Sequence, residues 1–110
     1  MEKSSLTALA RELLAAAATS GNGRAARTVV GGHERILRHT VIALTAGSML
    51  DEHDNPGEAT AHVLAGRIVL AVGDVSWEGS RGDLIVIPQA RHSVTAVEDS
   101  AFLLTVAKGR

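Results

Sequence analysis

Five histidines are the side chains of this sequence best suited to metal or ligand chemistry, because the chain has no cysteine. His53 lies in the stretch GSMLDEHDNPGEATAHVLAG, residues 47–66, together with His62 and several carboxylates. Imidazole and carboxylate groups are the ligands that Zn, Fe, Mn and Ni take from a protein without cysteine. The stretch is therefore either part of a metal site or a polar loop that leads into a strand. The other histidines are His33, His39 and His92.

A helix is predicted over residues 4–19, SSLTALARELLAAAAT. Ser4 or Ser5 is expected to cap its first turn by accepting a backbone N–H. Residues 21–23, Gly-Asn-Gly, are expected to end it, because Gly and Asn tolerate a left-handed C-cap. The apolar residues recur at helical spacing, which predicts a packing surface rather than a cofactor site. This stripe consists of Leu6, Leu9, Ala10, Leu13, Leu14 and Ala17.

After Arg27 the sequence changes to short apolar runs separated by turn residues, which is typical of an all-β sandwich or barrel. Gly73-Asp74 lies between two such runs and predicts a two-residue hairpin turn. No second helix is predicted. With 110 residues the chain fits one core. We divide it into an N-terminal helix with its linker, residues 1–26, and a β domain, residues 27–110.

Two motifs of this sequence resemble those of the cupin family. In the first, Gly47 is followed by five residues and then by His53, and Gly66 closes the motif. In the second, Gly82 is followed by DLIVI, a proline and, after three further residues, His92. The resemblance extends over roughly residues 30–107. Because several glycine and proline positions agree together, it is more specific than any single position.

The resemblance implies a cupin-type double-stranded β-helix, a jelly-roll barrel, here with one N-terminal α-helix. Cupins hold a metal inside the barrel with two histidines and a glutamate of the first motif and one histidine of the second. His53 and His92 match the first and last of these ligands. The second histidine position is Asn55, and the glutamate position is Ala59, with Glu58 one residue early. The resemblance thus implies a metal site at His53 and His92 with half of its usual ligands.

The resemblance implies that position 59, a ligand position of the family, faces the interior, and strand alternation then assigns the neighbouring side chains to the two faces. His62 is expected on the outer face. Glu58 is also expected to point outward, unless a bulge near residues 56–57 re-aims it. The residues expected to line the interior are Ala59, Ala61 and Val63.

His39 is the remaining candidate for the interior. Its neighbours on one face of the predicted strand are apolar, so we expect it to look inward, either as a hydrogen-bonded core histidine or as a ligand. His33 follows two glycines and is expected to be exposed. The predicted pocket residues beside the two metal ligands are His39, Asn55 and Glu58.

Two functions from different classes fit these residues. In the first, the chain is a cupin enzyme whose divalent metal, Fe, Mn, Ni or Zn, acts as a Lewis acid or oxygen activator on a small organic substrate. His53 and His92 would hold the metal, with help from His39, Glu58 or water. In the second, the chain is a non-enzymatic cupin that binds a small molecule as a sensor or storage domain. Its histidines would then be hydrogen-bonding groups in an apolar pocket.

Composition limits the expected partners. The formal net charge is −1, with 11 basic and 12 acidic residues, so no nucleic-acid partner is expected. The apolar runs are far shorter than the ~20 residues that span a bilayer, which predicts no membrane insertion. Without cysteines or the features of a signal peptide, the chain is predicted to be cytoplasmic. One barrel is not expected to cover the apolar face of the helix fully, which favours a homodimer.

Overall fold

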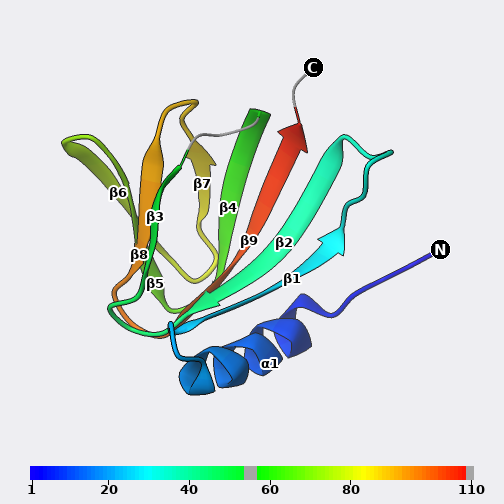
Figure 1. The fold of residues 1–110 in the computed structure, drawn as a ribbon, viewed down its shortest axis with the longest axis horizontal. Coiled ribbons are helices and arrows are strands. Elements are labelled where there is room, and N and C mark those ends of the chain that lie inside the picture. Colours follow the sequence, from blue (N-terminus) through cyan, green and yellow to red (C-terminus); the bar gives the residue numbers. More distant parts are fainter. Residues whose placement is uncertain (54–56, 109–110) are drawn as a thin grey trace.

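Two facing antiparallel sheets form the body of the molecule, and one helix lies beneath one of them (Figure 1). The computed structural model describes residues 1–53 and 57–108, and of His53 the backbone alone. The helix α1 spans Leu6–Thr19. The five-stranded sheet has the order β1 (Arg24–Val30), β2 (Leu37–Leu44), β9 (Ser100–Lys108), β4 (Gly57–Ala65) and β7 (Leu84–Ile87). The four-stranded sheet has the order β3 (Met49–His53), β8 (His92–Ala96), β5 (Arg67–Val72) and β6 (Val75–Ser80).

The main core fills the space between the two sheets. Side chains alternate along each strand, so one set of residues from each sheet points inward. Phe102 is the one phenylalanine of the chain, and it packs among aliphatic side chains. The innermost of these, at most 1% exposed, include Leu44, Val63, Ile68 and Leu70. This arrangement is the predicted all-β jelly roll.

Turns and crossovers bring distant segments together. The predicted hairpin is present: Gly73, with a φ of 57°, joins β5 to β6. By contrast, β9 inserts between β2 and β4, and β8 inserts between β3 and β5.

We call the top of the molecule in Figure 1 the upper end. It contains the starts of β2, β4 and β8 and the ends of β7 and β9.

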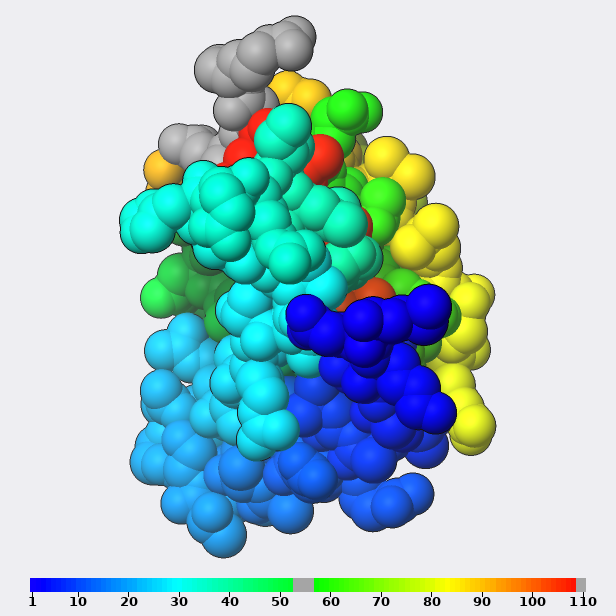
Figure 2. Space-filling model, turned by 90° about the vertical axis from the view of Figure 1, so that its right-hand side faces the viewer, coloured from blue at the N-terminus to red at the C-terminus, as the bar shows by residue number. Residues whose placement is uncertain are grey.

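The helix α1 packs on the outer face of the five-stranded sheet. Ser5 is its N-cap, because its Oγ accepts the N–H of Ala8 at 3.2 Å. Figure 2 looks at this side of the molecule, where α1 covers the lower part and β7 borders the right edge. The predicted stripe turns toward the sheet: Leu9, Ala10, Leu13 and Ala17 are buried against Val41, Ala43 and Ala101. The sheet of the same chain therefore covers the helix face, and the homodimer prediction loses this argument.

The end of the helix differs from the expectation. Ser20, directly after the helix, is extended rather than left-handed. The positive φ, 69°, occurs at Gly23, immediately before β1. β1 begins at Arg24, inside the segment that we assigned to the helix and its linker. Among the described residues, no helix has the length and apolar content that crossing a membrane requires.

Candidate functional site

His92 begins β8 at the upper end and faces the space between the sheets. Val94 and Ala96 belong to the core, and His92 shares their face of the strand because it precedes them at two-residue spacing. Only 1% of His92 is exposed. A buried polar group without a partner costs about 1–3 kcal/mol, so this ring needs hydrogen bonds.

A short turn orients the His92 ring. The Nδ1 atom lies 3.0 Å from the carbonyl oxygen of Ala90, and the N–H of Ala90 donates to the carbonyl of Pro88 at 2.9 Å. A carbonyl oxygen only accepts, so in the neutral imidazole the proton is on Nδ1 and the lone pair is on Nε2. This tautomer has a nitrogen that can accept a hydrogen bond from a ligand or bind a metal.

The backbone brings position 53 directly opposite His92. In the antiparallel pair of β3 and β8, Leu50 pairs with Val94 and His53 pairs with His92. His53 is three residues after Leu50 on β3, whereas His92 is two residues before Val94 on β8. The extra residue on β3 means that this strand contains a β-bulge. Opposed residues in such a ladder have Cα atoms about 4.5–5.5 Å apart. The side chain of His53 lies outside the described part of the chain, so its role as a ligand stays a prediction.

The other positions of the first motif do not bring a carboxylate to His92. Asn55 lies outside the described residues. Ala59 is buried on the inner face, as alternation predicted, and contributes only a methyl group. Glu58 pairs with Ala107 of β9 in regular register and is exposed on the outer face. The register shift of β4 lies near its other end, between Val63 and Ala65, so it cannot re-aim Glu58.

His39 lies on the outer face of its sheet, and the prediction that it looks inward is wrong. It does share a face with Val41 and Ala43, but these two residues pack against α1. Its Nδ1 lies 3.0 Å from Oγ1 of Thr105 on β9. Both faces of β2 contain apolar residues, so the sequence pattern could not tell the inner face from the outer one. His62 does lie on the outer face, and His33 is exposed, both as predicted.

Arg38 lies on the inner face of β2, although it belongs to neither of the two cupin motifs. It precedes Thr40 and Ile42 at two-residue spacing on β2, and it pairs with the core residue Val106 of β9. Arg38 is nevertheless exposed, because this part of β2 lies at the rim of the upper end. The alternation of β2 would have found it, once the inner face of this strand was known.

The comparisons with known proteins agree with this fold. The family model described as Cupin domain matches residues 40–107, more than half of the chain. The chain therefore belongs to the cupin family. A comparison with the curated proteins finds no match.

Several solved structures are similar to this chain. The conserved SPY1581 protein of unknown function from Streptococcus pyogenes is 28% identical, with a TM-score of 0.73 over 83% of this chain and 79% of that one. An RmlC-like cupin from Desulfovibrio desulfuricans is 27% identical, with a TM-score of 0.67 over 76% and 81% of the two chains. An HTH_3 family transcriptional regulator from Vibrio cholerae is 23% identical, with a TM-score of 0.67 over 79% of this chain and 52% of that one, and it shows the fold alone.

The residues that the structure describes do not fit the metal that many cupins hold. A tight transition-metal site takes three or four protein ligands. Ala59 supplies no donor, Glu58 faces outward, and His39 lies on the far side of its sheet. Among the described residues, no three His, Asp or Glu side chains form a group that could hold a metal ion. His92 with its register partner His53 is thus at most half of the family's ligand set.

Proposed function

We propose that this cupin binds a small organic molecule at the upper end of the space between its sheets, without a tightly held metal. The observation that carries the proposal is the His92 ring, which is buried while its Nδ1 is held by Ala90. In this proposal the ring contributes one hydrogen bond to the ligand, because the neutral tautomer with its proton on Nδ1 has Nε2 as an acceptor. A buried, oriented imidazole is a specificity group that requires no metal.

The charge at the rim favours a ligand with an acidic group. Arg38 is on the inner face at the same end, and it makes no ion pair with a described residue. A guanidinium can donate two parallel hydrogen bonds to one carboxylate. We therefore infer a ligand with a donor for His92 and an anionic group for Arg38.

Metal-dependent catalysis is the second candidate function, and the pairing of His53 with His92 favours it. If both imidazoles bind one Fe, Mn, Ni or Zn ion, the metal would supply Lewis acidity or oxygen activation. The ligand or water would then have to complete the coordination shell. This candidate differs from the first in requiring a stoichiometric metal.

Thermal-shift screening of small organic acids and their neutral analogues tests the proposal. The protein is purified without a histidine tag and screened with and without EDTA. We expect stabilising hits that survive EDTA and whose affinity falls about tenfold or more in His92→Ala, which corresponds to about 1.4 kcal/mol. Arg38→Gln should weaken the acidic hits selectively. His33→Ala is the matched control, because His33 is exposed in the β1–β2 connection.

Two experimental results would contradict the proposal. One equivalent of a transition metal by elemental analysis, with hits that disappear in EDTA, would establish the metal-dependent candidate instead. Hits that bind His92→Ala and wild type equally well would show that the ligand does not use this ring.

We also infer that the chain forms a homodimer through the outer face of β7. This strand is an edge of the five-stranded sheet. Leu84 and Val86 point outward from it and are 62% and 73% exposed. An edge strand with unpaired backbone groups and exposed apolar side chains is a ready surface for association.

A further inference from the structure

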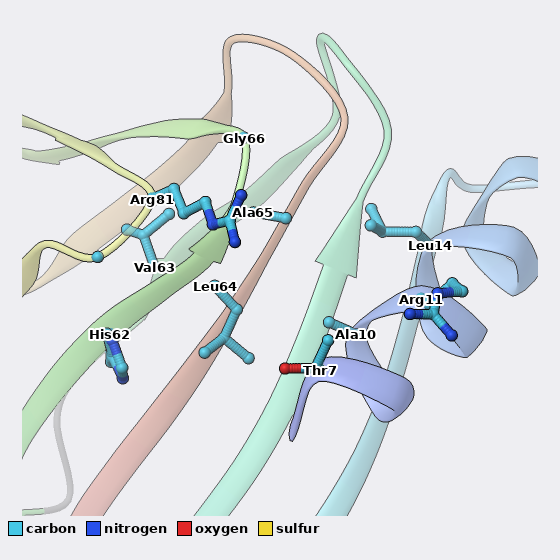
Figure 3. A pocket seen from close by; sticks show the side chains of 11 residues that line it. Thr7, Ala10, Arg11, Leu14, His62, Val63, Leu64, Ala65, Gly66 and Arg81 are labelled. Atoms are coloured by element: carbon cyan, nitrogen blue, oxygen red, sulfur yellow. The ribbon is translucent and has the colours of Figure 1, made fainter. Parts of the chain in front are cut away.

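A groove on the outside of the molecule separates α1 from the end of β4 (Figure 3). We call it the α1–β4 groove; its volume is about 530 Å³, within the ~300–1,000 Å³ of small-molecule sites. It lies on the opposite side of the five-stranded sheet from His92, because His62 and Leu64 point outward. The groove is lined by Thr7, Ala10, Arg11, Leu14, His62, Val63, Leu64, Ala65, Gly66, Arg81 and Gly82.

The groove is positively charged in a chain whose net charge is −1. Its lining includes two arginines and no carboxylate side chain. Arg11 comes from α1, and Arg81 comes from the connection between β6 and β7. Figure 3 shows that Arg81 reaches over the end of β4 toward Ala65, with Arg11 across the groove. Neither arginine forms an ion pair with a described residue.

Two neighbouring arginines, in contrast, do form ion pairs within the described part of the chain. Arg27 on β1 pairs with Glu12 of α1 at 3.4 Å, and Arg67 pairs with Glu78 at 3.5 Å. Arg11 lies next to Glu12 in the sequence, yet it lines the groove instead. Two guanidinium groups around one hollow attract an anion and raise its local concentration. His62 adds an imidazole to the same hollow.

Apart from Thr7, the other side chains that line the groove are apolar. Leu14 and Leu64 are only half-buried between the helix and the sheet, and Ala10 lies between them. Their exposed parts would gain about 25 cal/mol for each Å² removed from water. The groove therefore combines cationic groups at its sides with an aliphatic floor, which suits a ligand that is anionic at one end and apolar at the other.

We propose that the α1–β4 groove binds a small amphiphilic monocarboxylate, which Arg11 and Arg81 attract from the two sides of the groove and whose alkyl part lies on Leu14 and Leu64. Guanidinium groups match a carboxylate in geometry as well as charge. The site is independent of the interior site at His92, from which the five-stranded sheet separates it.

Titration of ¹⁵N-labelled full-length protein with octanoate, octanol and octylamine tests this proposal. Octanoate should shift the amide signals of Leu64, Ala65 and Gly66, and octylamine should not. Arg11→Gln and Arg81→Gln should each weaken octanoate binding by roughly tenfold. Arg35→Gln is the matched control, because Arg35 is exposed in the β1–β2 connection, away from the groove. His92→Ala should leave octanoate binding unchanged, which separates this test from that of the interior site.

Three results would overturn the proposal. Octanol that binds as tightly as octanoate would show that the groove does not select an anion. Octanoate shifts that appear around His92 rather than Ala65 would place the ligand inside the jelly roll. Shifts with an acidic, leucine-containing peptide but none with octanoate at millimolar concentration would make the groove a protein-docking surface instead.

Discussion

Ser100 and His92 are the two buried polar residues of the described chain, and they have different roles. The Ser100 hydroxyl accepts the N–H of Arg67 at 2.9 Å, and it lies 2.6 Å from the carbonyl of Glu98 and 3.0 Å from that of Arg67. These local contacts satisfy it where the chain passes from β4 to β5. A Cβ at Gly66, where φ is 77°, would overlap with this serine and with the carbonyl of Asp99. Ser100 is therefore a structural residue, whereas His92 lies on the inner face of β8 and belongs to the proposed interior site.

Ser100→Ala should lower the free energy of unfolding by about 1–3 kcal/mol, because the part-buried N–H of Arg67 loses its acceptor. Urea denaturation followed by circular dichroism measures the change. Ser76→Ala, on the exposed face of β6, is the control and should change stability little. An unaltered denaturation midpoint for Ser100→Ala would mean that water replaces the hydroxyl.

At the scale of elements, the helix and the bulge in β3 differ in how far the sequence specifies them. The stripe and the serine cap of α1 are local patterns, and both were predicted correctly. The bulge between Leu50 and His53 was not predicted, because no glycine or proline lies between these residues. It follows from the register that β8 imposes on β3. Without it, position 53 would not be opposite His92.

Leu13→Ala and Leu14→Ala compare two leucines of α1 that differ in burial. Leu13 is 5% exposed, whereas Leu14 is half-buried beside the groove. We expect Leu13→Ala to cost about 2–5 kcal/mol of unfolding free energy and Leu14→Ala clearly less. Thermal or urea unfolding of both variants measures this difference. Equal losses would mean that α1 does not pack on the sheet through its Leu13 side in solution.

At the scale of the whole molecule, the exposed apolar side chains of the edge strand β7 predict a homodimer. Light scattering at micromolar concentration should give a mass about twice 11.4 kDa. The double variant Leu84→Glu, Val86→Glu should be monomeric, because it places two like charges on the outer face of β7. Val75→Glu is the control, since Val75 is 54% exposed in the β5–β6 hairpin. A wild-type monomer would contradict the homodimer, and a dimeric double variant would move its interface elsewhere. The cytoplasmic location also stays a prediction.

The sequence by itself determined the helix, the all-β class, the hairpin at Gly73 and the inward position of Ala59. These features depend on local conformation and on side-chain periods of 3.6 or two residues, which can be read along the chain. The spacing of its glycines, prolines and histidines also indicated the family, which the family model then confirmed.

Only the tertiary structure decided which face of β2 is inside. His39 and Val41 lie on an apolar face, yet this face belongs to α1 and not to the space between the sheets. Arg38, on the other face of β2, reaches the rim beside the interior. The α1–β4 groove likewise joins residues from α1, β4 and the β6–β7 connection. These relations depend on which elements pack together. The hydrophobic pattern of a strand is the same whether a helix or a second sheet covers it, so the pattern alone cannot identify the covering element.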